Sequence, residues 1–243
     1  MIQRKMIQLT MIQRCVLLLP LLAVATVSSL VVAQEAKPGR LPPGLIRGPS
    51  QPVLDICVRG RMLRNQGDFD GARQAFEEAL TLARGIKDKS GEAWAISNVA
   101  TTYRYQAGLT SISANLALDV VLADKAIDLY KEALAIAQEN KDQYNEAYAT
   151  LYLGVLWAGR GETERAFKQF DKAMELYKAV DDRYYIGRTF VFMGATTLYM
   201  KREAQNAIPF FEKALPELRE SEMWHEAQAV ARDLFVAYGA LSQ

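Results

Sequence analysis

The sequence has 243 residues, of which 50% are hydrophobic and 23% are charged, enough apolar material for one or two domains with a buried core. Its formal net charge is only +1, and loss of Arg4, Lys5 and Arg14 with an N-terminal signal would leave 29 − 3 = 26 basic against 28 acidic residues. A chain so close to neutral has no global field to draw it to nucleic acid or to anionic lipid, so neither is an expected partner of the mature chain.

Residues 1–33 have the pattern of an export signal. A basic start precedes an apolar run from Cys15 to Val32, and Ala33 ends the run at a small-residue cleavage site before Gln34. The sequence therefore predicts a periplasmic or extracellular protein. An uncleaved membrane anchor is the alternative, because a run of about 18 residues approaches the length that spans a bilayer.

The true start of translation is open, because the triplet MIQ occurs at Met1, Met6 and Met11. Only Cys57 lies beyond the signal, so the mature chain has no internal disulfide and its stability must come from helix packing. We expect Cys57 to be a small buried hydrophobic residue. Residues 34–52 are rich in proline, glycine and arginine, and this composition predicts a partly extended, disordered linker.

From residue 53 onward the chain repeats one helical pattern. The clearest copy begins at Leu153 in LGVLWAGRGETERAFKQFDKAMEL, which reads as two amphipathic helices joined by a tight turn. The small residue that closes a second helix is followed at a constant interval by the small residue of the next first helix: Ala79 to Ala100, Ala133 to Gly154, and Ala173 to Gly194 (100 − 79 = 154 − 133 = 194 − 173 = 21). This regularity indicates that each helix pair stacks on the next in the same way.

Spacings within the pairs are also regular. The interval from Gly60 to Ala79 equals that from Gly154 to Ala173 (79 − 60 = 173 − 154 = 19), and the interval from Gly194 to Ala214 is one longer (214 − 194 = 20). The residues that carry the repeat are Gly60, Leu63, Gly67, Ala72, Phe76 and Ala79; Ala100, Tyr103, Ala126, Tyr130 and Ala133; Gly154, Trp157, Gly161, Ala166, Phe170 and Ala173; and Gly194, Ala207, Phe211 and Ala214.

This pattern resembles the tetratricopeptide repeat (TPR) family, in a variant of about 40 residues per repeat. The resemblance implies an all-α fold, a right-handed superhelical solenoid of antiparallel helix pairs with four repeats and a C-terminal capping helix. Together with the export signal, it suggests an exported protein of bacterial type. We expect repeats at residues 53–87, 90–139, 142–180 and 182–220, and the capping helix at 222–241.

Turn chemistry gives more local expectations. Ser90, Asp142, Asp182 and Ser221 are expected to cap helix N-termini, and Pro216 is expected to kink or shorten the last turns of its helix. The final helix should bury one apolar face: Met223, Ala227, Val230, Leu234 and Tyr238.

The second repeat is longer than the others. The interval from Ala100 to Ala133 is 133 − 100 = 33, which exceeds that of the first and third repeats by 33 − 19 = 14. Shared between two antiparallel helices, this excess predicts a hairpin about two turns taller, or roughly 10 Å. Apolar residues would then lie beyond the neighbouring repeats: Leu109, Ile112, Leu116 and Leu118. Either they fold onto the adjacent repeat or the linker, or they form a surface for a partner or for self-association.

Signs of catalysis are scarce. His225 is the only histidine of the sequence, and the chain has no glycine-rich phosphate loop, paired-cysteine zinc spacing or nucleophile elbow. We therefore predict no catalytic residue, no cofactor and no metal site.

In the family that this chain resembles, first helices line a concave groove that binds extended peptides. The resemblance places these groove candidates: Arg61, Arg64, Trp94, Asn98, Thr101, Arg104, Tyr105, Tyr148, Tyr152, Arg188 and Tyr199. The family's carboxylate clamp is matched only at Asn98, so capture of a chaperone tail is not expected.

Arginine forks grip carboxylates and carbonyls while aromatic faces cover apolar side chains, which favours a peptide site of acidic and aromatic preference. The alternative is that the aromatics pack between helices and the arginines form a solvated face. The prediction is a non-catalytic scaffold that binds a protein or peptide. The other interpretations are a structural or self-associating protein, or one anchored in a membrane by its N-terminus.

Overall fold

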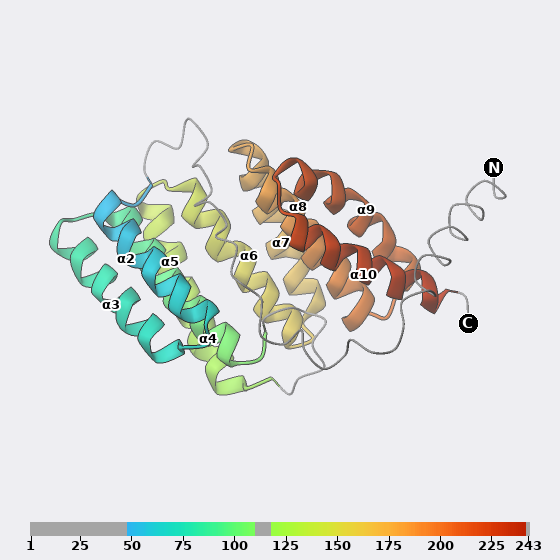
Figure 1. Ribbon diagram of the computed structural model, residues 1–243, viewed down its shortest axis with the longest axis horizontal. Coiled ribbons are helices and arrows are strands. Elements are labelled where there is room, and N and C mark those ends of the chain that lie inside the picture. Colours follow the sequence, from blue (N-terminus) through green and yellow to red (C-terminus); the bar gives the residue numbers. More distant parts are fainter. Residues whose placement is uncertain (1–47, 110–117, 242–243) are drawn as a thin grey trace, which may run out of the picture. The chain divides into compact units, whose positions relative to one another are not determined.

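The computed structural model describes residues 48–109 and 118–241, and these fold as α-helices that pack in chain order (Figure 1). The predicted export signal and most of the linker lie outside the described residues. The helices form four pairs and a final helix: α2 (Gln51–Asn65) with α3 (Phe69–Gly85), α4 (Lys89–Gln106) with α5 (Val120–Glu139), α6 (Gln143–Gly159) with α7 (Thr163–Ala179), α8 (Arg183–Ala195) with α9 (Ala204–Glu220), and α10 (Trp224–Ala240).

We call α2, α4, α6 and α8 the first helices, and α3, α5, α7 and α9 the second helices. Each helix contacts the next, and α4 also contacts the first helices on both sides of it. The described residues contain no strand. The predicted all-α architecture of stacked helix pairs is therefore confirmed.

Close approach within a pair is set by a glycine that faces a phenylalanine. A Cβ atom added to Gly154 would lie 2.6 Å from Cε1 of Phe170, and one added to Gly60 would lie 2.6 Å from Cε1 of Phe76. Both rings are fully buried. The glycines thus leave the space that each ring fills, which explains why small and aromatic residues recur in step along the sequence.

Aspartates cap most of the helix starts. Asp142 accepts a hydrogen bond from a backbone N–H of α6 and Asp182 accepts one from α8, each at 3.0 Å, as the sequence predicts. The prediction of Ser90 is wrong, because Asp88 caps α4 and Ser90 lies buried in its first turn. Ser221 is also not an N-cap, since it directly follows the last residue of α9.

The second pair does not form the predicted taller hairpin. α4 and α5 have 18 and 20 residues, close to the 17 of α3, α6 and α7. The extra residues lie instead in the connection between Gln106 and Val120, of which residues 110–117 are outside the described part. Gly108 takes a φ of +87° just after α4, and the side chain of Asp119 caps α5. These two local signals end one helix and begin the next.

Two of the four apolar residues of the predicted hairpin surface lie among the described residues. Leu109 is buried against α6, where a Cβ added to Gly159 would lie 2.7 Å from Leu109 Cδ2. Leu118 is partly buried and packs against the core. Ile112 and Leu116 lie outside the described residues. Leu109 and Leu118 therefore pack on the fold and do not project beyond it.

The fourth pair absorbs one additional residue in a π-helical segment. α8 continues directly into η1 (Thr196–Met200), and a π-turn holds one residue more than an α-turn. This matches the interval from Gly194 to Ala214, which is one longer than the corresponding interval in the first and third pairs. Gly194 still faces Phe211, since an added Cβ would lie 2.7 Å from its Cε1 atom.

The last two helices differ from the prediction in detail. α9 contains both Pro209 and Pro216 and still runs 17 residues, so the predicted shortening at Pro216 is wrong. Leu218 is fully buried just beyond this proline, and its packing holds the last turn in place.

α10 covers α9 with one apolar side and exposes another. Ala227 and Val230 are buried as predicted, whereas Tyr238 is half exposed and its hydroxyl donates to Glu212 of α9 at 3.1 Å. On the outward side, Phe235 is 77% exposed.

Replacement of Gly154 by alanine should destabilise the fold by about 1–3 kcal/mol, because the added Cβ also lies 3.2 Å from the Ala166 carbonyl oxygen and the helices must move apart. Chemical denaturation of the full chain measures this loss. Gly85→Ala is the matched control, since nothing lies within 4 Å of its added Cβ, and it should be neutral or stabilising by up to about 1 kcal/mol. The losses from Gly154→Ala and Phe170→Leu should be less than additive, and full additivity would contradict the contact.

Candidate functional site

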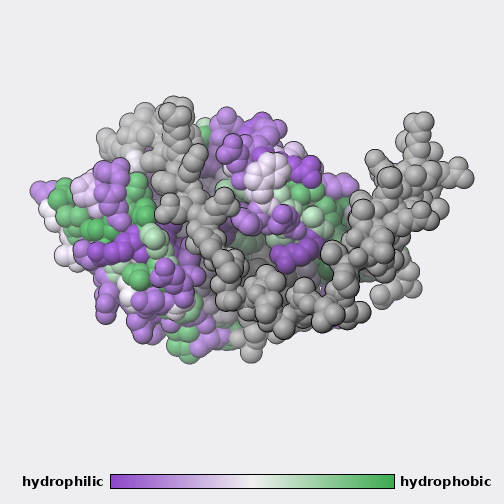
Figure 2. Space-filling view, in the orientation of Figure 1, coloured by the Kyte–Doolittle hydropathy of each residue, from purple (hydrophilic) through white to green (hydrophobic). Residues whose placement is uncertain are grey.

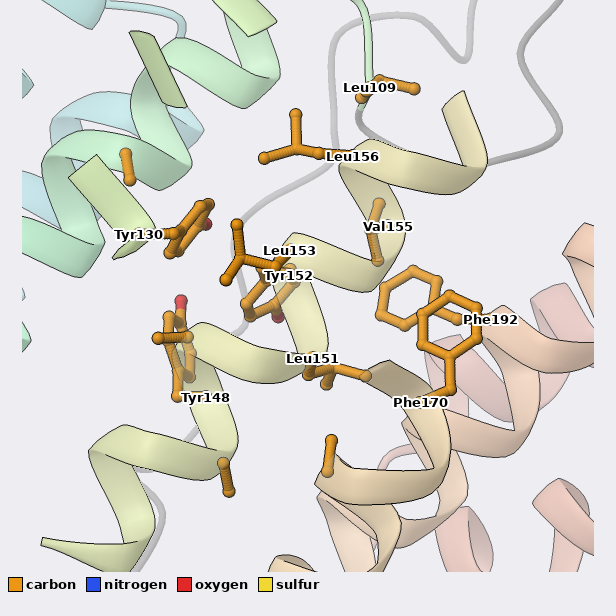
Figure 3. Close-up of a cluster of buried hydrophobic side chains, with 14 of the residues drawn as sticks. Leu109, Tyr130, Tyr148, Leu151, Tyr152, Leu153, Val155, Leu156, Phe170 and Phe192 are labelled. Atoms are coloured by element: carbon orange, nitrogen blue, oxygen red, sulfur yellow. The ribbon is translucent and has the colours of Figure 1, made fainter. Parts of the chain in front are cut away.

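Aromatic side chains join the first helices into one layer. The ring centroids of Trp94 and Tyr148 are 5.0 Å apart, those of Tyr148 and Tyr152 are 4.6 Å apart, and those of Tyr152 and Phe192 are 6.1 Å apart. Figure 3 shows Tyr148 and Tyr152 on α6 facing Tyr130 on one side, with Phe192 and Phe170 on the other. The groove candidates Trp94, Tyr148 and Tyr152 thus pack between helices and form one buried layer.

Three arginines alternate with two tyrosines across this layer, and we call these five residues the arginine–tyrosine row: Arg64, Tyr105, Arg104, Tyr152 and Arg188. The Cζ atoms of Arg64 and Arg104 lie 5.3 and 4.7 Å from the ring centroid of Tyr105. Those of Arg104 and Arg188 lie 4.8 and 5.7 Å from the ring centroid of Tyr152. The row therefore takes residues from α2, α4, α6 and α8, and cation–π contact holds each guanidinium in place.

Polar bonds fix the helix positions around the row. Arg64 donates to the side-chain oxygen of Asn98 at 3.5 Å, and the Asn98 amide donates to the Trp94 carbonyl oxygen at 2.8 Å. The hydroxyl of Thr101 lies 2.8 Å from that of Tyr130 and 3.2 Å from that of Tyr148. Asn98 and Thr101 are therefore engaged within the protein, and both are buried.

The row has no counter-charge in the described part of the chain. Ion pairs form between other side chains there, but none includes Arg64, Arg104 or Arg188. Arg188 reaches a carboxylate only indirectly, because it donates to the hydroxyl of Tyr184, which donates to Glu226 at 3.4 Å. Arg64 and Arg104 are buried and therefore do not belong to the solvated face of the alternative interpretation, whereas Arg61 and Arg188 are partly exposed.

The three arginines of the row change the pKa of Tyr105. Burial would raise the pKa of Tyr105, but Arg104, Arg188 and Arg64 outweigh it and lower the pKa below its usual value. Burial also opposes the charge of Arg104, yet the pKa of Arg104 is raised because Tyr130, Tyr105 and Tyr152 surround it. The guanidinium of Arg104 therefore stays charged inside the protein.

Other candidates lie apart from the row. The hydroxyl of Tyr199 donates to Asp233 of α10 at 2.7 Å, so this side chain ties η1 to the last helix. Arg61 is partly exposed, one turn before Arg64 on α2. It lies near Cys57, which is fully buried, and burial raises the pKa of this thiol to about 12 against the opposing charge of Arg61. Cys57 is therefore the buried hydrophobic residue that the sequence predicts.

Tyrosines of the third and fourth repeats extend the layer beyond the predicted set. Tyr185 stacks on Tyr177 with centroids 4.7 Å apart and meets Tyr148 at 5.8 Å. Tyr144 lies 5.9 Å from Tyr185. The four-residue spacing of Tyr144, Tyr148 and Tyr152 is the signal that could have found Tyr144, because such residues share one helix face.

Metal-binding clusters and membrane-spanning helices are both absent from the part of the chain that the structure describes. Within residues 48–109 and 118–241, no group of three histidine, cysteine or acidic side chains could hold a metal ion. No helix in these ranges combines the length and apolar character needed to cross a membrane. Figure 2 shows hydrophilic residues over much of the visible described surface, interrupted by smaller hydrophobic patches.

Comparison with known proteins agrees with this architecture. Residues 58–85 match the tetratricopeptide repeat family model, and residues 94–156 match that of anaphase-promoting complex subunit 5. The TPR-like repeats of a Podospora anserina kinesin light chain align with a TM-score of 0.55 at 11% identity, covering 79% of this chain and 88% of that one. The MamA protein aligns with a TM-score of 0.33 at 19% identity, covering 71% of this chain and 94% of that one. No curated protein matches.

The helix stacking, the repeat match and the kinesin light chain alignment support a protein of tetratricopeptide type. Its fold is the TPR-like solenoid that the sequence predicts. Stacked repeats of this kind present extended surfaces suited to protein interaction.

Stability should fall at alkaline pH because of the buried tyrosines. Burial raises the pKa of Tyr144, Tyr177 and Tyr185 in the folded chain, whereas an unfolded tyrosine ionises near about pH 10. Their stabilising contribution is therefore complete below about pH 10 and is lost as the pH rises from there toward the folded-state pKa values. Urea denaturation at increasing pH, followed together with tyrosinate absorbance, measures this decline.

Tyr105 provides the internal control for this titration. Because its pKa is lowered, it should ionise while the chain is still folded, and Tyr105→Phe should remove that early step alone. Ionisation of every tyrosine in one step near about pH 10 without unfolding would contradict the burial.

Proposed function

We propose that this protein is an exported, non-catalytic scaffold that binds an extended segment of a protein partner across its first helices. The observation that carries the proposal is the arginine–tyrosine row, which takes side chains from all four first helices. A segment lying over the row would contact its partly exposed members, Tyr105 of the second repeat and Arg188 of the fourth.

An ordered, buried base beneath two partly exposed side chains favours recognition over a purely structural role. Its base of Trp94, Tyr148 and Tyr152 is buried and interlocked, while Tyr105 and Arg188 remain partly exposed. Binding to side chains that are already ordered costs little conformational entropy. Aromatic and arginine side chains also supply most of the energy at protein interfaces.

Charge reversal at the partly exposed arginines of the first helices, Arg61 and Arg188, should weaken partner binding. In the double variant Arg61→Glu and Arg188→Glu, affinity for a partner recovered by crosslinking from the exported fraction should fall at least about tenfold. The matched control reverses two exposed lysines of α7, Lys168→Glu and Lys178→Glu, and should bind as the wild type does. Equal affinity of both variants would place the partner elsewhere, and recovery of only the chain itself would favour self-association.

Export forms a separate part of the proposal and rests on the sequence of residues 1–33. If the signal is cleaved after Ala33, N-terminal sequencing of the exported chain should begin at Gln34. Replacement of Ala33 by a bulky residue should block cleavage, because the enzyme pocket at that position takes small side chains. An intact N-terminus on wild-type protein in the membrane fraction would instead identify an anchor.

A further inference from the structure

One line of side chains on α10 is uncovered in the part of the chain that the structure describes. Its five members are all exposed, and we call them the outer seam of α10: Trp224, Gln228, Ala231, Phe235 and Tyr238. Trp224 is 58% exposed and Phe235 is 77% exposed. Rings of this size gain free energy when they leave water, so a line of them along one helix suggests an interaction surface.

The spacing of the outer seam is that of a helix-packing surface. Its intervals alternate between four and three residues (228 − 224 = 235 − 231 = 4 and 231 − 228 = 238 − 235 = 3). A pattern that repeats every seven residues keeps one stripe facing a second helix along its whole length. None of the five side chains is charged, so another helix can lie on the seam without burying a charge.

The corresponding side of α8 shows what kind of element fits there. A Cβ added to Gly187 would lie 3.0 Å from Leu218 Cγ, and one added to Gly194 would lie 2.7 Å from Phe211 Cε1, so both positions of α8 face α9. Gln228 and Phe235 follow these two glycines at one interval (228 − 187 = 235 − 194 = 41). The outer seam is therefore the side on which a first helix packs against an antiparallel second helix.

The opposite side of α10 is already occupied. Tyr199 of η1 donates to Asp233 at 2.7 Å, and Tyr184 of α8 donates to Glu226 at 3.4 Å. These bonds hold α10 on the fourth pair and leave the outer seam facing away from it.

The outer seam is complementary to a second copy of itself. When two seams lie antiparallel about a two-fold axis, Ala231 can lie opposite Gln228 of the second copy. Because Phe235 lies four residues after Ala231, and Trp224 four residues before Gln228, the same register places Phe235 opposite Trp224 of the second copy. The axis repeats both contacts, so a pair of rings closes each end of a narrower middle.

From these observations we infer that the outer seam of α10 is a dimer interface, occupied by the outer seam of a second copy of this chain in antiparallel orientation. The second copy's α10 takes the place that α9 takes on α8. The inference goes beyond the proposed function, because the arginine–tyrosine row has no residue on α10. A dimer presents two rows, which strengthens binding to a partner that carries two matching segments.

The length of the seam sets the strength of the dimer. α10 has 17 residues and is therefore about 25 Å long. One pair of helices of this length buries an area near the lower limit of specific interfaces, about 1,000 Å². We therefore expect monomer and dimer in exchange, with a dissociation constant of about 1–100 µM.

Sedimentation equilibrium of the chain recovered from the exported fraction tests the interface. Phe235→Glu places a charge in the seam at an exposed position, so the monomer should fold normally while self-association weakens at least about tenfold. Val236→Glu is the matched control, because Val236 is also exposed on α10 but lies outside the seam, and it should associate as the wild type does.

Two outcomes of this experiment would overturn the inference. One is a wild-type chain that stays monomeric up to about 1 mM, whether residues 15–32 or another protein then covers the seam. The other is equal association of wild type and Phe235→Glu, or equal loss in Phe235→Glu and Val236→Glu, since the contact would then lie elsewhere. Circular dichroism and chemical denaturation verify that both variants fold.

A charge pair tests the register. Gln228→Lys and Ala231→Glu should each associate more weakly than the wild type, because the two-fold axis brings the two introduced like charges near each other. An equimolar mixture should recover dimers that contain one chain of each kind, since the introduced ammonium and carboxylate then lie opposite each other. Native mass spectrometry measures the composition, and a mixture that associates no better than either variant alone would refute the antiparallel register.

Discussion

The contact between a first-helix glycine and a second-helix phenylalanine sets the distance on which the remaining architecture depends. In three pairs a Cβ on the glycine would fall 2.6–2.7 Å from the ring: Gly60 with Phe76, Gly154 with Phe170, and Gly194 with Phe211. Rings as far apart in sequence as Trp94 and Phe192 join one layer through Tyr148 and Tyr152 of α6. The second pair has Ala100 and Tyr130 at these places, and the added hydroxyl bonds to Thr101.

The sequence was sufficient to predict the helix pairs, because small and aromatic residues must recur wherever backbones meet closely. It could not say where extra residues go. The excess in the second repeat gives the same count whether it lengthens two helices or one connection, and only local features such as Gly108 and Asp119 decide for the connection. The one-residue excess before Ala214 also does not show where the extra residue lies, since a π-turn and a longer loop both keep the next helix in phase. Asp88 and Ser90 are both good caps two residues apart, so tertiary packing chose between them.

For the site, the resemblance identified residues that share the first-helix face, but it did not give their depth. Arg64 and Arg104 have side chains long enough to lie on Tyr105 or to reach solvent, and the spacing of α2, α4 and α6 selects the first. Tyr199 lies within the π-helical segment η1, whose wider turn shifts the angular position of its residues, so a repeat alignment misplaces it. Burial then changes the role of the arginines from surface charges to confined ones, which no linear pattern records.

Phe235 shows what the same packing rule means at the far side of α10. Its interval from Ala214 (235 − 214 = 21) is the one that elsewhere leads to Ala100, Gly154 or Gly194, and it is 77% exposed. At this position the earlier first helices have a small residue, which leaves room for an aromatic ring of the paired helix, whereas α10 has a phenylalanine side chain that projects outward. For a helix packed on that side of α10, the interaxial distance would exceed the usual value of about 8–10 Å by about the thickness of a phenyl ring. The geometry that propagates from pair to pair along this protein therefore has no matching seat on the outward side of its last helix.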